Sequence, residues 1–122
     1  MSEHNLKNIE KIIKALADKN RLRMIYLLNE KRDLCVCEIT GIIGLSQPTI
    51  SSHLRLLENA GLVESSKDGL WVNYSINSQA DLFSRRSIET ICKDLKKDKQ
   101  AIADLEKLKA IDRDKICRKT HK

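Results

Sequence analysis

Residues 44–61 read Gly-Leu-Ser-Gln-Pro-Thr-Ile-Ser-Ser-His-Leu-Arg-Leu-Leu-Glu-Asn-Ala-Gly, and this stretch decides the fold. Ser46 is a favourable helix N-cap, and Pro48 falls in the first helical turn, where its missing N–H costs nothing. Apolar residues then recur at helical spacing, at Ile50, Leu54 and Leu57. Because Gly61 ends this pattern, we predict a helix over residues 47–59 with one buried face.

The segments on either side indicate the motif to which this helix belongs. Helical spacing of apolar residues precedes it in residues 5–17, 21–31 and 37–43. After it, residues 70–76 alternate like a strand, and the turn dipeptide Asp68-Gly69 separates them from Leu62, Val63 and Glu64. A short helix, a tight turn, a longer capped helix and a hairpin make a winged helix-turn-helix. We therefore predict a mainly α fold with one β-hairpin.

The charge distribution indicates a polyanionic partner. The net charge is +6, and residues 76–122 carry most of it, with 13 Lys/Arg against 8 Asp/Glu. Helical spacing returns there at about residues 80–97, and the Lys-rich segment after it suggests a further amphipathic helix. We therefore divide the chain into a winged domain, residues 1–97, and a basic C-terminal helical extension, residues 98–122.

No stretch approaches the ~20 apolar residues of a membrane span, and the sequence begins without an apolar signal region. We expect no membrane partner and a cytoplasmic location. A structural disulfide is then unfavourable, so the four cysteines are expected to be reactive, metal-binding or buried.

The polar face of the 47–59 helix suits a DNA major groove. Opposite or beside its apolar stripe lie Gln47, Thr49, Ser51, Ser52 and Arg55. Glutamine can pair with adenine edges, and hydroxyls can bond bases or phosphates, while Lys67 at the hairpin tip can reach the backbone or minor groove. The alternative is a solvated face that contacts nothing. Since this face carries few charges, salt-dependent binding would have to come from Lys19, Arg21, Arg23 or the tail.

A pair of cysteines lies in residues 33–40, which read DLCVCEIT. On a helix, Cys35 and Cys37 would point about 200° apart, whereas in extended chain they lie on the same side. We therefore expect the pair to bind one ion only if the start of the 37–43 helix is irregular or unwinds. Thiolates select soft ions such as Zn²⁺, Cd²⁺, Pb²⁺, As(III) or Sb(III). The alternative is a pair of small buried side chains.

A third ligand is not evident. Two ligands are too few for a closed zinc site, and the histidines, at positions 4, 53 and 121, are poor candidates. Cys92 lies on an apolar stripe and is expected in the core or an interface. Cys117 lies in the basic tail, from which it can reach the pair in its own or a partner subunit, or it is a stray thiol.

Together these features resemble the ArsR/SmtB family of winged-helix metalloregulatory repressors. The resemblance covers roughly residues 12–76 and rests on four stretches: ALADKNRLRMIYLL, DLCVCEI, LSQPTISSHLRLLENAGLV and DGLWVNYSI. It implies a homodimer, joined through the first and last helices of the core, that holds operator DNA and leaves it when metal binds. It also implies base reading by Gln47, Thr49, Ser51 and Ser52. DLCVCEI resembles the cysteine box of arsenic-sensing and cadmium/lead-sensing members, but Thr40 stands where arsenic sensors carry a third cysteine.

These observations predict a repressor, not an enzyme. We expect As(III) to bind Cys35 and Cys37, with Cys117 as a candidate third ligand, and to shift the reading helices by distorting the helix that follows the pair. Sb, Cd and Pb are alternative inducers, and no cofactor is required for the fold. The rivals are a sensor of cysteine oxidation, a metal-buffering protein without a DNA role, and a cysteine enzyme. The last lacks a Cys–His pair.

Overall fold

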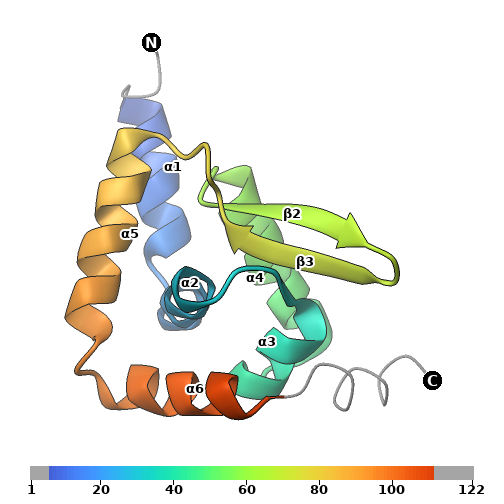
Figure 1. Ribbon diagram of the computed structural model, residues 1–122. Coiled ribbons are helices and arrows are strands. Elements are labelled where there is room, and N and C mark those ends of the chain that lie inside the picture. Colours follow the sequence, from blue (N-terminus) through green and yellow to red (C-terminus); the bar gives the residue numbers. More distant parts are fainter. Residues whose placement is uncertain (1–5, 112–122) are drawn as a thin grey trace.

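The computed structural model describes residues 6–111, which form helices around a small antiparallel sheet (Figure 1). In chain order the elements are α1 (Leu6–Leu16), α2 (Lys19–Glu30), β1 (Leu34–Cys35), α3 (Val36–Ile43), α4 (Gln47–Asn59), β2 (Val63–Asp68), β3 (Trp71–Ile76), α5 (Leu82–Leu95) and α6 (Lys99–Ala110). The predicted class, mainly α with a β-hairpin, is confirmed. None of the helices within residues 6–111 is long and apolar enough to span a bilayer.

The helix-turn-helix consists of α3, a tight turn and α4. Gly44 ends α3 in the left-handed region at φ +86°, where its N–H bonds the Thr40 carbonyl at 2.9 Å. Ser46 then caps α4 by accepting the Thr49 N–H at 3.3 Å. The predicted stripe of Ile50, Leu54 and Leu57 is fully buried. The sequence therefore predicted both the bounds and the buried face of α4.

The sheet differs from prediction in two ways. Its strand order is β1-β3-β2, so a two-residue strand that the sequence did not reveal joins the hairpin, with Cys35 opposite Asn73. In addition, β2 extends to Asp68, which pairs with Trp71, so the turn falls at Gly69 and Leu70. The hairpin projects from the helices as a wing (Figure 1). As a result, β1 joins the segment carrying the cysteine pair to the wing by backbone hydrogen bonds.

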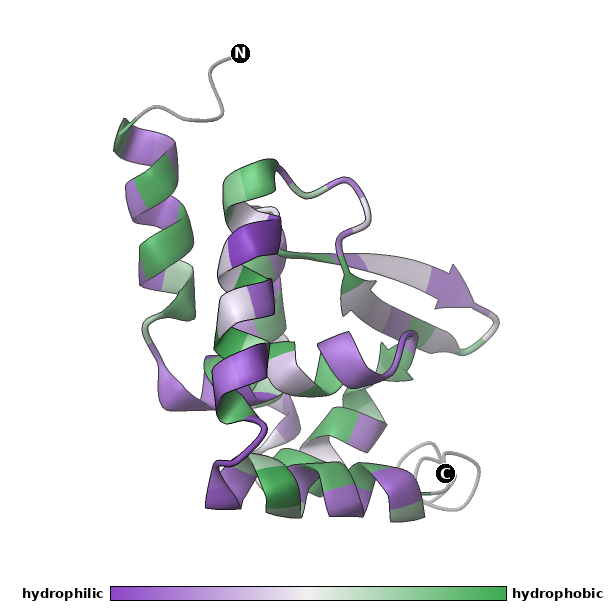
Figure 2. Cartoon of the chain, turned by 60° about the vertical axis from the view of Figure 1, so that its left-hand side comes forward, coloured by the Kyte–Doolittle hydropathy of each residue, from purple (hydrophilic) through white to green (hydrophobic). Residues whose placement is uncertain are grey.

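The core is built around α2, whose residues 24–28 are all buried. Apolar faces of the surrounding helices turn toward it, as the hydropathy colouring shows (Figure 2). The segment after α5 forms α6, which packs on α2 and α3. Arg23 on α2 fixes α6 through a bidentate ion pair with the fully buried Asp104, with both N–O distances at 2.9 Å.

Candidate functional site

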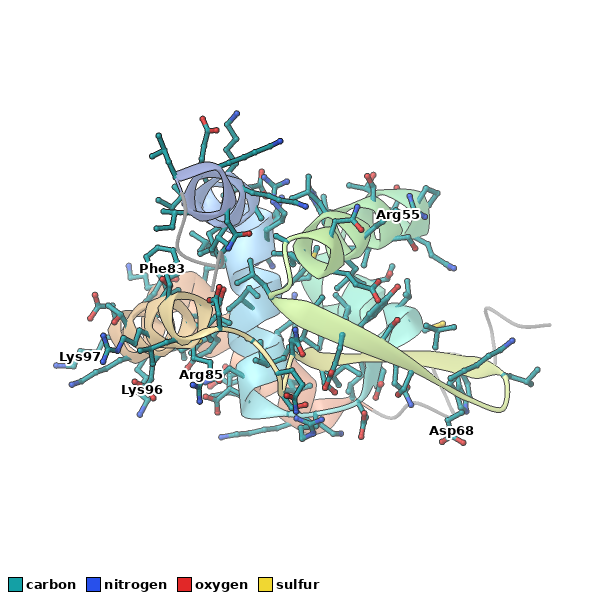
Figure 3. The ribbon with its side chains drawn as sticks, turned by 90° about the horizontal axis from the view of Figure 1, so that it is seen from above. Arg55, Asp68, Phe83, Arg85, Lys96 and Lys97 are labelled. Carbon is teal, nitrogen blue, oxygen red and sulfur yellow. The ribbon has the colours of Figure 1, made fainter. Side chains whose placement is uncertain are left out.

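The residues predicted to read DNA lie on the outer face of α4. Gln47, Thr49, Ser52 and Arg55 are exposed, and Ser51 is half-buried. The Thr49 hydroxyl also lies 2.9 Å from the Ser46 hydroxyl, so it contributes to the helix cap. Figure 3 shows Arg55 on the side of α4 that faces away from the rest of the protein. This face can enter a groove without any rearrangement of the core.

The wing supplies a second exposed element. Lys67 is exposed near its tip, as predicted, and is followed by Asp68, which Figure 3 shows at the end of the hairpin. Leu70, in the turn, is 80% exposed. Lys67 and Asp68 have opposite charges, so the wing tip is close to neutral.

Lys19, Arg21 and Arg23 of α2 were predicted to make DNA binding salt-dependent. Arg21 and Arg23 instead bond other residues of the protein. Arg21 donates to the Ala15 carbonyl at 2.7 Å and lies 3.1 Å from His53 Nδ1, so it connects α1 to α4. Arg23 bonds Asp104. Lys19 remains exposed. Lys96 and Lys97 extend from the end of α5 that is far from the wing tip (Figure 3).

The cysteine pair lies across a strand–helix junction. Cys35 ends β1 in an extended conformation, with φ −86° and ψ 164°, while Cys37 is already in the first turn of α3. Both are buried, and both pack against Trp71 of β3, the first residue after the wing turn. We predicted that the pair can share an ion only if the start of this helix is irregular or unwinds. The structure has the first of these two arrangements, because Cys35 lies in extended chain outside α3.

Glu38 stabilises this junction. It is 3% exposed, and its Oε1 accepts the Cys35 N–H at 3.0 Å. A glutamate three residues after a helix N-cap is the acidic half of a capping box, so the spacing was visible in the sequence, although cysteine is an unusual partner for it. The bond keeps the first turn of α3 in register with the strand that carries Cys35.

Both cysteines line a small, half-open cavity of about 120 Å³. Its other walls come from Val36, Gln47, Leu70, Trp71 and Val72. The cavity thus contacts the first residue of α4 on one side and the wing on the other. Sequence reasoning missed Trp71 as a wall of this site, because its contact with the cysteines depends on the pairing of β1 with β3.

The residues that the structure describes offer no third thiol or imidazole at this site. Cys92 packs in the main core, apart from the Cys35–Cys37 cluster, and burial together with the nearby Glu30 charge raises its pKa to about 11. The prediction of a buried Cys92 is confirmed. Cys117 lies outside the described residues.

Comparison with known proteins identifies the family. A model of the bacterial regulatory protein arsR family matches residues 18–65. The arsenical resistance operon repressor of Escherichia coli (strain K12) is 38% identical over 78 residues, which are 64% of this chain and 67% of that protein. The chain belongs to the ArsR family.

Two further proteins are similar to this chain, one in sequence and one in structure. The cadmium resistance transcriptional regulatory protein CadC homolog of Staphylococcus aureus is 38% identical over 79 residues, covering 65% of this chain and 65% of that protein. The homodimeric winged helix-turn-helix DNA-binding domain of a possible ArsR-family regulator from Mycobacterium bovis superposes with a TM-score of 0.62 at 27% identity, covering 76% and 84% of the two chains. The Escherichia coli and Staphylococcus aureus relatives are named as transcriptional regulators, which agrees with the prediction that the chain is not an enzyme.

An apolar groove of this ArsR-family chain runs between α1 and α5. It is lined by Leu16, Phe83, Arg86, Ser87, Thr90 and Ile91, and Figure 3 shows Phe83 pointing from α5 toward α1. Nearby on the same two helices, Leu6 is 85%, Ile13 52% and Leu82 44% exposed. Large apolar side chains gathered on two neighbouring helices are typical of a protein–protein interface.

Proposed function

We propose that this ArsR-family chain is a homodimeric repressor that holds operator DNA in the cytoplasm and releases it when a thiophilic ion, trivalent arsenic above all, binds Cys35 and Cys37. In this account α4 enters the major groove, the wing contacts the adjacent backbone, and two protomers place their α4 helices in successive turns of an imperfect palindrome. Gln47, Thr49, Ser51, Ser52 and Arg55 face the bases and phosphates, and Lys67 faces the backbone or minor groove.

The observation that carries the proposal is the shared cavity. Cys35 and Cys37 line the same hollow as Gln47 of the reading helix and Trp71 of the wing. An ion bound by the two sulfurs occupies space between the two elements that contact DNA. Any displacement that the ion causes therefore changes the distance between the wing and α4. Bound DNA allows only one such distance, because its grooves and backbone have a fixed spacing.

The dimer follows from the groove between α1 and α5. A monomer leaves Leu6 and Ile13 in water, whereas a second copy packed along α1 and α5 would cover them. That the similar domain from Mycobacterium bovis is homodimeric supports a dimer. Two reading helices also double the number of base contacts, which a single α4 with few charges needs for specific binding.

The test is a DNA-release titration. A binding sequence is first selected in vitro from random duplex DNA with the full chain, and the complex is then titrated with arsenite, antimonite, Cd²⁺ and Pb²⁺. We expect arsenite to release wild-type protein, and Cys35→Ser and Cys37→Ser each to abolish release while DNA binding without the ion is retained. Cys92→Ser is the matched control, since this buried cysteine lies in a different cluster, and it should respond like wild type.

The outcomes separate the alternatives. Release that persists in the Cys35→Ser/Cys37→Ser double variant would refute the assignment of the site. Release by peroxide but not by arsenite, reversed by a dithiol, would identify an oxidation sensor instead. Cadmium acting alone would place the chain with sensors of divalent ions, in keeping with the name of its Staphylococcus aureus relative.

A further inference from the structure

Thr40 is the one described residue with a fully buried side-chain N or O atom that has no hydrogen-bond partner. Its Oγ1 has no partner among residues 6–111. A threonine inside a helix can donate to the carbonyl four residues back, yet here it makes no such bond. A buried hydroxyl without a partner costs free energy, and native proteins retain few of them. Such a hydroxyl is available to bond a water molecule or a bound ligand.

Thr40 is adjacent to the cysteine pair along α3. It follows Cys37 by three residues, so the two side chains occupy neighbouring positions on one side of the helix, with Cβ atoms about 5–6 Å apart. Its hydroxyl is therefore the nearest uncommitted polar group on α3 to the thiols. Ile39 and Ile42, on the opposite side of α3, are buried in the main core.

The number of thiols limits what the site can bind. Zn²⁺ prefers four protein ligands in a closed site, and no group of three or more candidate side chains gathers anywhere in residues 6–111. Trivalent arsenic forms three bonds and enters a protein as As(OH)₃. Two thiols replace two of its hydroxyls: As(OH)₃ + 2 RSH → (RS)₂As–OH + 2 H₂O. Two As–S bonds form, two As–O bonds break, the thiol protons leave in water, and arsenic remains trivalent.

We infer that Cys35 and Cys37 hold trivalent arsenic that keeps one hydroxyl, and that the Thr40 hydroxyl is the hydrogen-bond partner of that remaining hydroxyl. The inference rests on the proposed function, because it assumes that the two thiols bind the inducer. It assigns Thr40 to the site and makes a third thiol unnecessary. It also gives the site a preference for As(OH)₃ over an organoarsenical, whose third bond is to carbon and offers nothing for the hydroxyl to bond.

The experiment measures binding without DNA. The chain has one tryptophan, Trp71, which packs against both cysteines, so its fluorescence reports occupancy. Wild type, Thr40→Val, Thr40→Ser and Cys117→Ser are titrated with arsenite and with phenylarsine oxide. We expect Thr40→Val to weaken arsenite binding about tenfold, the effect of one lost hydrogen bond. Binding of phenylarsine oxide should be unchanged. Thr40→Ser, which keeps the hydroxyl, and Cys117→Ser should both match wild type.

A separate measurement distinguishes binding from folding. Valine has nearly the shape of threonine and removes the unpaired oxygen, so ion-free Thr40→Val should melt at the same temperature as wild type or higher. Thr40→Ala repeats the binding comparison should the valine variant fold poorly.

Three results would overturn the inference: unchanged arsenite affinity in Thr40→Val, equal weakening for both arsenicals, or a large loss in Cys117→Ser. Arsenite binding that survives in Cys35→Ser/Cys37→Ser would instead refute the proposed function, so the two failures are distinguishable.

Discussion

The ion pair between Arg23 and Asp104 provides the most quantitative prediction about the fold. Asp104 is fully buried and accepts two N–H groups from Arg23 at 2.9 Å and one from Gln100 at 3.0 Å. Arg23 also donates to the Ile43 carbonyl at the end of α3 at 3.5 Å, so the pair joins α6 to the helix-turn-helix. Asp104→Ala leaves a guanidinium without its counter-ion in a largely dry site. Breaking such a buried pair costs about 3–5 kcal/mol.

We expect the lower end of this range, because Arg23 keeps its bonds to Asn20 and Ile43. A loss of about 3 kcal/mol lowers the melting temperature by about 12 °C for a domain of this size. Urea unfolding followed by circular dichroism measures the loss. The double variant Arg23→Met/Asp104→Leu, which replaces both charges by apolar groups, should recover at least half of it.

The matched control is Glu10→Gln, which breaks the exposed pair between Glu10 and Lys14 and should leave stability unchanged. A loss of less than about 1 kcal/mol in Asp104→Ala, or a double variant no more stable than the single one, would contradict a stabilising buried pair.

Three further predictions concern single positions. Asp18→Ala should cost about 1 kcal/mol of stability by removing the N-cap of α2. The hydrogen bond from the Arg21 N–H lowers the pKa of Asp18 in the folded protein. The stability that this cap contributes is therefore present above the ordinary pKa of 3.8 and is lost as the pH falls through the lowered folded pKa. Urea unfolding curves that show the same loss in Asp18→Ala at pH 7 and at pH 2.5 would contradict this prediction. Cys92, with its pKa raised to about 11, should react with iodoacetamide at pH 8 about a hundredfold more slowly in the folded than in the unfolded protein. Mass spectrometry of the labelled peptides measures both rates, and equal rates would exclude a buried thiol. Gly44→Ala should lower the free energy of unfolding by about 1–2 kcal/mol, because the backbone at Gly44 has φ +86°. Nothing lies within 4 Å of the added methyl group, so the loss comes from backbone strain and not from a clash. Calorimetry that finds no destabilisation would show that the turn rearranges freely.

The helix that enters DNA could be predicted from the sequence because its signals are local. A serine cap, a proline in the first turn and three apolar residues at helical spacing lie within 12 residues of one another, from Ser46 to Leu57. The wing was predicted from the same kind of local alternation. Only its turn was misplaced, because Asp68 pairs within the sheet and is not part of the loop.

The geometry of the thiol site could not be predicted in the same way. β1 has two residues, too few for any periodic pattern, and it forms only because β3 offers a partner strand. That pairing places Cys35 in extended chain and brings Trp71 against the cysteine pair. Arg23 and Asp104 are 81 positions apart in the sequence, so no local pattern predicts their ion pair. The sequence therefore left open whether the start of the helix is irregular or has to unwind, and the pairing of β1 with β3 makes it irregular.

Linkage provides the most direct test of the central claim, that an ion at Cys35 and Cys37 is coupled to DNA release. If the ion weakens DNA binding by some factor, DNA must weaken ion binding by the same factor. Arsenite affinity, measured through the fluorescence of Trp71, is compared for free protein and for protein saturated with its selected DNA. The account predicts that DNA lowers the affinity at least about tenfold, equal to the factor by which arsenite lowers DNA affinity. Equal arsenite affinities with and without DNA would contradict it.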